Sequence, residues 1–488
     1  MNIVLINPPT SFDQIYGQWD LSGVDTYCPP LGLLYIASYL REHHHAPHVI
    51  DVQAMNWSCQ ETVECALSHS PDVVGISAKT INIHNAGEIA GELKSEGYVG
   101  PIVVGGAQIT ALPAETLGRF RAIDYGVIGE GEIAFLEVVE NIKLKKPVRD
   151  VRGVVWRNGI EQTVVNPPRP LMEDLDQLPF PAWDLLVDFP DGYPHNALET
   201  KRLPSASIIT SRGCPFQCTF CDRAVFGSRV RQHSAEYTLG MIRHLQEVYG
   251  IRDLMILDDN FMLDKGKLFT ICDTIREERM DLSWFCQGHV KFMTDDRLAK
   301  MRDAGCWFVE MGIESGCDRI LKLIKKNTNK AEIAEAVRRA HKAGLKVKGN
   351  FIFGLPTETI ESLEETTQFA ASIDLSYFQQ NFMTLWPGCE IARNAERYGH
   401  VETDWDRLSD KRITFIPSGL SAEDLLKASK AAFRRFYLRP RILFEILLQS
   451  LTSWRAAHNA IVAFVAFLKT MSRPDRGALP ETPAAALP

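Results

Sequence analysis

Three cysteines near the middle of the chain have types and spacing that could hold a metal centre. Cys214, Cys218 and Cys221 follow a predicted strand with the spacing C-x3-C-x2-C. Structural zinc normally takes four protein ligands, and here only His233 could approach as a fourth. Three thiolates on a four-iron cluster leave one iron open for a small molecule with an amine and a carboxylate. We therefore favour an iron–sulfur cluster over a zinc site or a redox pair.

The composition places this site in a multi-domain chain. A length of 488 residues is enough for two to four domains of roughly 100–200 residues each. The formal net charge of −8 gives no reason to expect a nucleic-acid partner. The first residues, MNIVLINPPTSF, resemble a strand and not an export signal. We therefore expect a cytoplasmic protein whose clustered cysteines bind metal and do not form disulfides.

Residues 1–145 are predicted to form a Rossmann-like α/β domain. Short β-branched runs alternate with segments of helical periodicity, which is typical of a parallel sheet covered on both faces. The runs lie at 3–6, 48–52, 73–77, 102–104 and 125–128, and the helical segments at 31–42, 59–68, 82–95 and 113–120. Ligands of such sheets bind beyond the carboxyl ends of the strands, where this chain has several glycines.

A second α/β series is predicted over residues 201–398, after a hairpin and linker at 146–200. Asn158-Gly159 favours a tight two-residue turn in that hairpin. The second series predicts a partial (β/α)6 barrel, whose strand carboxyl ends should carry the chemistry. Its strands are expected at 207–211, 253–258, 283–288, 307–312, 347–353 and 380–385, with helices at 235–249, 265–279, 295–304, 330–343 and 360–373.

The remainder of the chain is predicted to be a helical C-terminal region, 399–472, and a disordered Pro/Ala-rich tail, 473–488. The apolar stretch 442–468 is interrupted by charged residues, so it falls short of the roughly 20 apolar residues of a spanning helix. A helix packed on the barrel is the first expectation. Peripheral membrane contact through this stretch is the alternative.

The cysteine spacing, with Phe220 before the last cysteine, resembles the radical S-adenosylmethionine (SAM) superfamily. The sequences LDDNF, EMGIESG, NFIFGLP and WPG, at the ends of the second, fourth, fifth and sixth barrel strands, are also similar to it. With the N-terminal sheet in front, residues 1 to about 400 resemble the subfamily with a cobalamin-binding domain. That subfamily contains many methyltransferases, the class B radical methyltransferases.

The resemblance implies a place for SAM as well as for a [4Fe–4S] cluster on the three cysteines. Phe220 would lie near the adenine, and Glu314 would face the adenosyl group. Gly354 and Leu355 would admit the adenine, and Asp259 would lie at the rim of the site. The alternatives are that Glu314 is an ordinary polar strand end and that Gly354 is a turn glycine.

Cobalamin is the third cofactor that the resemblance implies. The chain has no Asp-x-His-x-x-Gly motif, and 43–45 (HHH) ends a predicted helix, so we expect no histidine on the cobalt. A dinucleotide site is disfavoured because Asn-Pro-Pro follows the first strand in place of a glycine-rich loop. The alternative is a domain that binds no cofactor or binds substrate. The expected cobalamin-binding residues are Asn7, Pro8, Ser77, Thr80, Gly105, Gly106, Ala107, Gly129, Glu130 and Gly131.

The resemblance implies methylation of an unactivated carbon. A 5′-deoxyadenosyl radical would abstract hydrogen from the substrate, and methylcobalamin would supply the methyl group. The alternatives are an oxidative cyclase or ring-rearranging enzyme without methyl transfer, and a cobalamin sensor or carrier with a structural cluster. The expected partners are a small-molecule substrate, such as a natural product, lipid or tetrapyrrole intermediate, and an electron donor such as flavodoxin or ferredoxin. Acid or base residues and the substrate are not readable from the sequence.

Overall fold

The N-terminal part of the computed structural model is a seven-stranded sheet in the order β2-β1-β3-β4-β5-β6-β7. The structure describes residues 1–11, 14–15, 27–159, 162–193, 199–450 and 465. The first five strands are parallel, which confirms the predicted Rossmann-like fold: β1 (Asn2–Asn7), β2 (Ala46–Asp51), β3 (Val73–Ser77), β4 (Ile102–Gly105) and β5 (Tyr125–Val127). The chain direction across the sheet reverses between β1 and β3, where such folds bind ligands.

Helices cover both faces of this sheet. One face packs against α2 (Leu31–Glu42) and α8 (Gly131–Lys143). The other packs against α4 (Cys59–Ser68), α5 (Ile83–Ser95), α6 (Ala107–Ala111) and α7 (Pro113–Arg119). Because both faces are buried, the strands are almost continuously apolar.

The predicted hairpin, β6 (Val154–Asn158) and β7 (Gln162–Val165), is not a free linker element. β6 pairs antiparallel with β5, so the hairpin extends the N-terminal sheet. Val154 and Val155 are fully buried, which explains why the hairpin docks there. The linker that follows is described up to residue 193 and includes the short turns η3 (Leu175–Gln177) and η4 (Trp183–Leu185).

The second sheet has six parallel strands in the order β15-β14-β13-β12-β11-β8 and confirms the predicted partial barrel. The strands are β8 (Ser205–Ile208), β11 (Asp253–Ile256), β12 (Ser283–Gly288), β13 (Cys306–Glu314), β14 (Lys346–Phe353) and β15 (Tyr377–Phe382). The last strand begins three residues earlier than predicted. The apolar residues Met383 and Leu385, which favoured the later range, follow the strand and pack in a separate apolar cluster.

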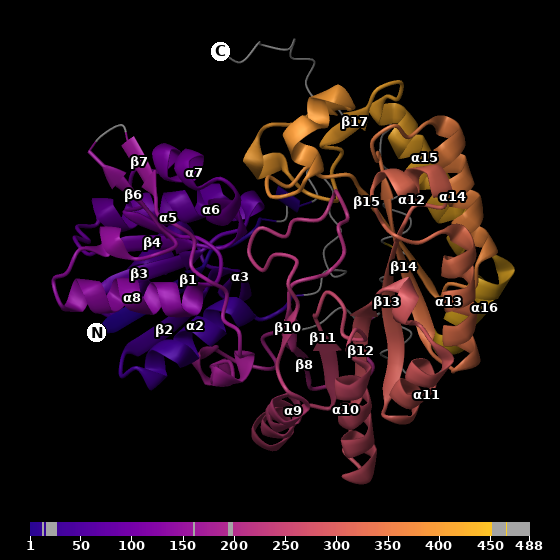
Figure 1. Ribbon diagram of the computed structural model, residues 1–488, viewed down its shortest axis with the longest axis horizontal. Coiled ribbons are helices and arrows are strands. Elements are labelled where there is room, and N and C mark those ends of the chain that lie inside the picture. Colours follow the sequence, from indigo (N-terminus) through magenta and orange to yellow (C-terminus); the bar gives the residue numbers. More distant parts are fainter. Residues whose placement is uncertain (12–13, 16–26, 160–161, 194–198, 451–464, 466–488) are drawn as a thin grey trace.

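The outer face of the barrel sheet packs against helices in the large apolar core. These helices are α9 (Ala235–Tyr249), α10 (Lys265–Glu277), α11 (Asp295–Asp303), α13 (Lys330–Lys342), α14 (Ile360–Ser372) and α15 (Ala422–Tyr437). Figure 1 shows α11, α13, α14 and α15 on the side of the barrel away from the N-terminal domain, and α9 and α10 below the sheet. The inner face therefore looks toward that domain.

The C-terminal region contacts both domains. Between β16 (Gly399–Val401) and β17 (Phe415–Pro417), the turn η7 (Trp405–Arg407) reaches the N-terminal domain, where Asp406 pairs with His84. Ser409 Oγ also donates to the carbonyl of Ile15 at 2.8 Å. This region, in orange, lies over the junction of the two domains (Figure 1). The apolar stretch 442–468 is described only as far as the end of α16 (Pro440–Ser450) and at 465; the rest of it and the tail lie outside the described residues.

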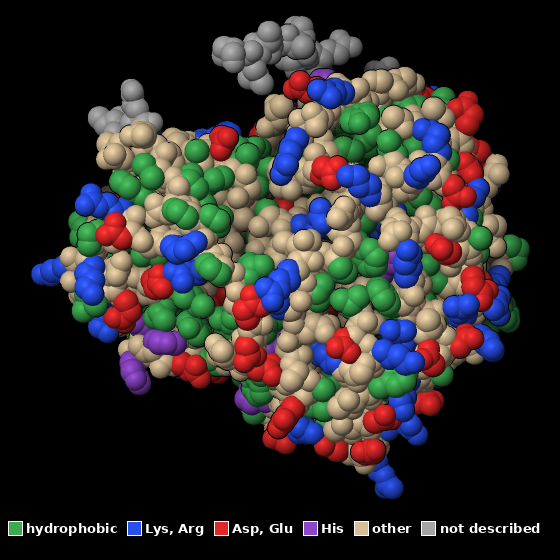
Figure 2. All heavy atoms as spheres, viewed as in Figure 1, with side chains coloured by type: hydrophobic (Ala, Val, Ile, Leu, Met, Phe, Trp, Pro, Cys, Tyr) green, Lys and Arg blue, Asp and Glu red, His purple; other side chains and the backbone are tan. Residues whose placement is uncertain are grey.

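Among the described residues, no helix has the length and apolar character needed to cross a membrane. Acidic and basic side chains are interspersed over the face shown in Figure 2.

Candidate active site

The cysteine loop leaves the barrel at β8 and passes through the short strand β9 (Ser211–Arg212). Gly213 precedes the first cysteine with φ +87°, and a Cβ there would lie 2.3 Å from the carbonyl oxygen of Arg229. Only glycine fits that backbone and that contact. The turn directs Cys214, Cys218 and Cys221 to the carboxyl edge of the barrel sheet.

The three thiols lie close enough to influence one another. Burial raises the pKa of each thiol, and the pKa of Cys221 rises to about 12 through burial, Asp259 and the other two thiols. A bound metal centre would reverse this effect by stabilising the thiolates.

The spacing of these sulfurs bears on the choice of metal. Among the described residues, the three sulfurs do not form a group within 4.8 Å of one another. A single zinc with bonds of about 2.3 Å would hold them about 3.8 Å apart. His233, the possible fourth zinc ligand, pairs instead with Asp176 at 3.1 Å. The arrangement fits a larger cluster better than a single zinc ion.

Glu314 forms a buried ion pair that the sequence did not reveal. Lys326 Nζ lies 2.6 Å from Glu314 Oε1, and both side chains are at most 10% exposed. The pKa of Lys326 is raised because Glu314 and Cys218 outweigh the effect of burial. Lys326 also lies 5.8 Å from the centre of the Phe220 ring. The pair therefore places a fixed cation between the cysteine loop and the end of β13.

The backbone around this pair is shaped for it. Glu314 has φ +68°, and the pairing of β13 with β14 shifts register between Gly312 and Glu314. A Cβ on Gly312 would lie 2.3 Å from Glu314 Oε1. Non-glycine residues with positive φ store strain and occur often at functional sites. This geometry disfavours the alternative that Glu314 is an ordinary strand end.

The polar residues that follow β11 have different roles: one supports the fold and the others face the site. Asp258 is buried and accepts hydrogen bonds from Thr210 and Ser211, so it joins β11 to the cysteine loop. The carboxylate of Asp259 contributes to the raised pKa of the thiols of Cys214 and Cys221, and burial raises the pKa of Asp259 itself. Asn260 is 5% exposed, and neither amide atom has a hydrogen-bond partner among the described residues. A polar ligand such as SAM would satisfy such a group.

Gly354 and Leu355 form a turn held by a carboxyl group. Glu358 Oε2 accepts hydrogen bonds from the amides of Gly354 at 2.7 Å and Leu355 at 3.0 Å. Burial raises the pKa of Glu358 to about 8. Gly354 has φ +86°, so it is also a turn glycine. Leu355 and Phe220 belong to the same apolar cluster, which brings two of the predicted adenine contacts together.

The expected cobalamin residues lie along the carboxyl edge of the N-terminal sheet. Among the described residues, a Cβ on Gly105 would meet nothing within 4 Å, and one on Gly129 would approach only Val225, at 3.9 Å. These two glycines leave room for a bulky ligand against the main chain. Gly106 is instead required by its close approach to the main chain of Ala78, and a Cβ on Gly131 would meet the end of the Ile36 side chain at 2.7 Å.

The polar residues at the other strand ends are engaged by neighbouring groups. Asn7 Nδ2 donates to Asp51 Oδ1 at 2.8 Å, and Tyr27 also donates to this oxygen. Pro8 accepts a hydrogen bond from Asn82 through its carbonyl. Thr80 is buried, Ser77 is half-buried, and Ala107 begins α6. Asp51 and Tyr27 were missed because nothing local in the sequence places them beside Asn7.

Glu130 has a different role from the expected cobalamin contact. Its carboxylate binds Arg212 at 2.9 Å and Arg231 at 2.7 Å, and Arg212 also binds Glu132 at 2.6 Å. All four side chains are at most 9% exposed. The Glu130 side chain is thus committed to joining the two domains and is not free for a ligand. Arg212 stands two residues before Cys214, so the same network anchors the cysteine loop.

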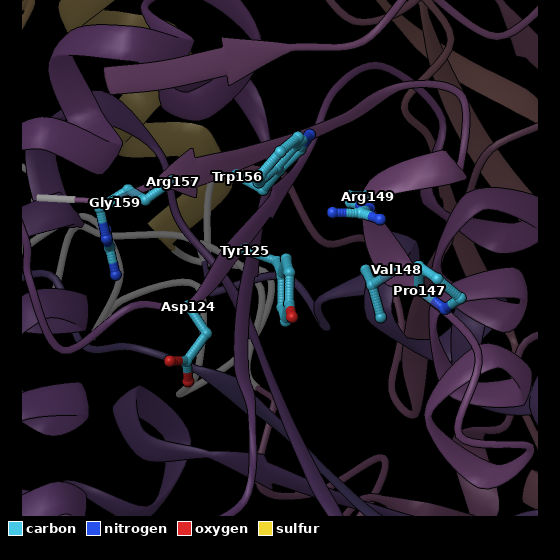
Figure 3. A pocket seen from close by; sticks show the side chains of 8 residues that line it. All are labelled: Asp124, Tyr125, Pro147, Val148, Arg149, Trp156, Arg157 and Gly159. Atoms are coloured by element: carbon cyan, nitrogen blue, oxygen red, sulfur yellow. The ribbon is translucent and has the colours of Figure 1, made fainter. Parts of the chain in front are cut away.

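Two surface hollows lie outside the carboxyl edges of the two sheets. Figure 3 shows one of about 520 Å³, with Tyr125 and Trp156 in its walls. Tyr125 is the first residue of β5, so this hollow is at the opposite end of the strand from the glycine edge. The other, of about 660 Å³, is bordered by the cysteine loop at Pro215–Gln217 and by Lys291 and Lys322.

Comparisons with known proteins agree with this geometry. The family model described as the radical SAM superfamily matches residues 208–370, and the B12 binding domain model matches residues 21–139. The chain is 33% identical to an uncharacterized methyltransferase of Pyrococcus horikoshii, covering 91% of this chain and 94% of the relative. It is 27% identical to a cytidylyl-2-hydroxyethylphosphonate methyltransferase of Streptomyces wedmorensis, over 84% and 86% of the two chains.

Solved structures share the architecture. The radical SAM methyltransferase TsrM of Kitasatospora setae, with cobalamin and a [4Fe–4S] cluster bound, aligns with a TM-score of 0.70 at 16% identity. The alignment covers 96% of this chain and 98% of TsrM. The cobalamin-dependent SAM radical enzyme OxsB aligns with a TM-score of 0.72 over 95% of this chain and 72% of OxsB, also at 16% identity.

The chain therefore belongs to the radical SAM superfamily and, within it, to the family with a B12-binding domain ahead of the barrel. It is an enzyme whose cofactors are a [4Fe–4S] cluster, SAM and cobalamin. The unpartnered amide of Asn260 and the open space at Gly105 fit a polar and a bulky ligand, respectively.

Proposed function

We propose that the enzyme is a methyltransferase that acts on an unactivated carbon of a small-molecule substrate. One observation carries the proposal: the carboxyl edges of the two sheets face each other. At the carboxyl edge of the N-terminal sheet, Gly129 approaches Val225, which lies four residues after the last cysteine. The next residue, Glu130, binds Arg212, which lies two residues before the first cysteine. A methyl carrier on one edge and a radical source on the other would thus share one substrate space.

The chain's own residues would position the reactants and exclude water. When bound, the cluster and SAM supply a 5′-deoxyadenosyl radical, and cobalamin supplies a methyl group. Cys214, Cys218 and Cys221 would hold the cluster, while Lys326 and Asn260 would orient the polar part of SAM. Phe220 and Leu355 would cover the adenine with apolar surface. Hydrogen-atom abstraction and radical methyl transfer require placement and dryness more than an acid or base side chain.

Anaerobic purification and reconstitution test this proposal. Iron, sulfide and cobalt are counted, and products are analysed by mass after incubation with SAM, a reductant and a small-molecule extract of the source organism. We expect 5′-deoxyadenosine, S-adenosylhomocysteine and a product heavier by one methylene unit. Cys218→Ala should abolish the first and third. Failure to form 5′-deoxyadenosine would leave only a sensor or carrier role.

A cyclase is the second candidate. The chain is 25% identical to an anaerobic magnesium-protoporphyrin IX monomethyl ester cyclase of Rubrivivax gelatinosus, over 91% of this chain and 78% of that enzyme. A cyclase would produce a lighter product, by loss of hydrogens, and no S-adenosylhomocysteine. The same mass measurement therefore separates the two.

An external one-electron donor, such as flavodoxin or ferredoxin, would dock beside the cysteine loop. The hollow at Pro215–Gln217 is bordered by the exposed lysines 291, 322 and 325, although the chain as a whole is acidic. Phe216, within this loop, stacks on His289 at 3.8 Å, so the surface is packed directly onto the barrel interior. Small electron-carrier proteins of this kind are acidic, and charge complementarity speeds their association.

Charge reversal tests this docking surface. Lys291→Glu with Lys322→Glu should lower flavodoxin-driven SAM cleavage by about tenfold at low salt. Cleavage driven by dithionite should not change, because a small reductant needs no docking. Lys145→Glu with Lys146→Glu, on the exposed far side of the N-terminal domain, is the matched control. Equal losses with both reductants would exclude this surface.

Peripheral membrane contact is a further proposal for the C-terminal helix. Leu443, Phe444 and Leu448 of α16 are 48–59% exposed. Such a helix can lie in a membrane interface. Flotation with anionic and neutral lipid vesicles tests the idea, and a protein that stays at the bottom of the gradient with both would end it.

A further inference from the structure

The inner face of the barrel sheet carries a band of polar side chains. The residues that alternate with them pack outward: Val309 and Met311 flank Glu310, and Phe351 follows Asn350, all in the large core. Glu310 and Asn350 must therefore point inward, because successive side chains of a strand point to opposite faces. By the same alternation Gln287, Lys348 and Gln379 also point inward.

Register brings these inward residues to one level. Glu310 pairs with Gln287 on one side and with Lys348 on the other. Asn350 pairs with Gln379 on β15. The five residues therefore form a continuous band across β12, β13, β14 and β15. We call Gln287, Glu310, Lys348, Asn350 and Gln379 the polar band.

The lysine of the polar band is shared by two carboxylates. Lys348 Nζ lies 2.5 Å from Glu199 Oε1 and 3.2 Å from Glu310 Oε1, so one ammonium group serves two carboxylates. These carboxylates raise the pKa of Lys348 in spite of its burial. Glu310 therefore shares its ammonium partner with a second carboxylate, and its carboxylate can accept a hydrogen bond from a further donor.

Several acceptors in the polar band remain available. Asn350 Nδ2 donates to Glu310 Oε1 at 2.6 Å, and a carboxylate can only accept, so Asn350 Oδ1 is free to accept. That oxygen is buried without a partner among the described residues. Glu310 Oε2 accepts no hydrogen bond from any described residue.

Gln379 adds a further acceptor. Lys411 Nζ donates to Asn381 Oδ1 at 2.6 Å, and Gln379 Nε2 donates to the same oxygen at 3.3 Å. Because that oxygen can only accept, the Gln379 amide must turn its nitrogen toward Asn381. No described residue donates to Gln379 Oε1. Three acceptors on adjacent strands match the three N–H groups of an ammonium ion.

An apolar floor lies below the polar band. Met255, Phe285 and Phe308 form it together with Cys28, which reaches in from the N-terminal domain. The register shift before Phe285 turns Trp307 toward the same cluster, where its indole N–H is buried without a partner among the described residues. The SAM residues Glu314 and Asp259 lie above the band, at the strand ends. The band thus separates the floor from the radical source.

We infer that the polar band binds the substrate, and that the substrate is a small polar molecule with a protonated amino group that pairs with Glu310. Its amino group lies at the polar band, and its carbon skeleton extends from the band toward the strand ends, where the reacting carbon lies. This inference rests on the proposed methyltransferase function. It disfavours a lipid or a tetrapyrrole, because a flat or long apolar molecule would leave these acceptors buried and unpaired.

Labelled methyl transfer tests the inference even while the substrate is unidentified. The reconstituted enzyme is incubated with methyl-¹⁴C SAM, a reductant and the small-molecule extract. The mixture is then divided by organic extraction and by cation exchange at neutral pH. The label should appear in a compound, separated from SAM by chromatography and absent from incubations with Cys218→Ala enzyme, that the cation exchanger retains and that N-acetylation releases. Label in the organic phase, in unretained compounds or nowhere overturns the inference.

Two variants connect that compound to the band. Glu310→Gln keeps the shape and should lower labelled product by about tenfold or more, since it removes a buried charged acceptor. Glu364→Gln, exposed on α14, is the matched control and should have no effect. Equilibrium dialysis of the isolated compound gives an independent readout: binding should weaken with Glu310→Gln only. Equal binding to both variants overturns the inference.

The same experiment separates the inference from the proposed function. S-adenosylhomocysteine and 5′-deoxyadenosine are measured in every incubation. If both form while the label is elsewhere, the substrate class is wrong and the methyltransferase stands. If neither forms, the proposed function fails and the inference falls with it.

Discussion

The carboxyl edges of the two sheets solve different binding problems in the same fold class. The N-terminal edge offers main chain and space, at Gly105 and Gly129, and its most prominent charge, Glu130, is used to join the domains. The barrel edge offers thiols and the buried Lys326–Glu314 pair. A large ligand can be held by shape along a backbone. A small charged ligand needs fixed charges in a dry environment, where electrostatic interactions are strongest.

Removing a thiol should abolish the function of the barrel edge only. Cys218→Ala should lower 5′-deoxyadenosine formation by about a thousandfold or more, since a cluster with two protein ligands is not retained. Cobalamin affinity, followed by the absorbance of the bound corrin, should stay within about twofold. Wild-type iron content in this variant would show that the cysteines are not the ligands.

Removing the buried cation should damage both activity and stability. Lys326→Met leaves Glu314 buried without a counter-charge, which should cost about 3–5 kcal/mol of unfolding free energy. SAM cleavage should fall by about a hundredfold, because a charged contact to the ligand is lost. Adding Glu314→Gln should recover much of the stability, measured by urea unfolding, but not the cleavage. Recovery of cleavage as well would limit the pair to a structural role.

Filling the open space at Gly105 should weaken ligand binding at the N-terminal edge only. Gly105→Val places a side chain where a Cβ meets nothing within 4 Å, so it should weaken cobalamin binding by about tenfold without loss of iron. Gly91→Val is the control, because Gly91 lies in α5 and its Cβ position is also open. Unchanged cobalamin affinity in Gly105→Val would move the corrin away from this edge.

The smallest effect on activity is expected from a substitution of Glu358, whose carboxyl group holds the Gly354 turn. Its pKa of about 8 in the folded chain lies above the ordinary glutamate value of 4.5, so the native state binds the extra proton. Unfolding free energy should therefore fall as pH rises from 4.5 to 8, by up to about 1.4 kcal/mol per pH unit. Glu358→Gln should flatten that dependence and change SAM cleavage by less than about twofold. If the pH dependence of the unfolding free energy were the same in Glu358→Gln, the raised pKa would not belong to Glu358.

Local patterns in the sequence predicted much of the fold and part of the site. Strand β12 and helix α9 have the predicted bounds, because their apolar periodicity and capping residues are local signals. The cysteine spacing is local as well. Lys326 and Glu310 could not be found this way, since their roles depend on which strands and turns meet in space. The ion pairs of the Glu130 side chain could not be predicted, because its partners are 82 and 101 residues distant.

Those sequence distances also set an order of assembly during synthesis. Glu130 and Glu132 leave the ribosome about eighty residues before Arg212, so the folded N-terminal domain presents two acidic side chains in advance. The cysteine loop is synthesised later and can then pair with these acidic side chains. A barrel produced alone would lack the acidic partners of Arg212 and Arg231, so we expect the first domain to stabilise the cysteine loop of the second.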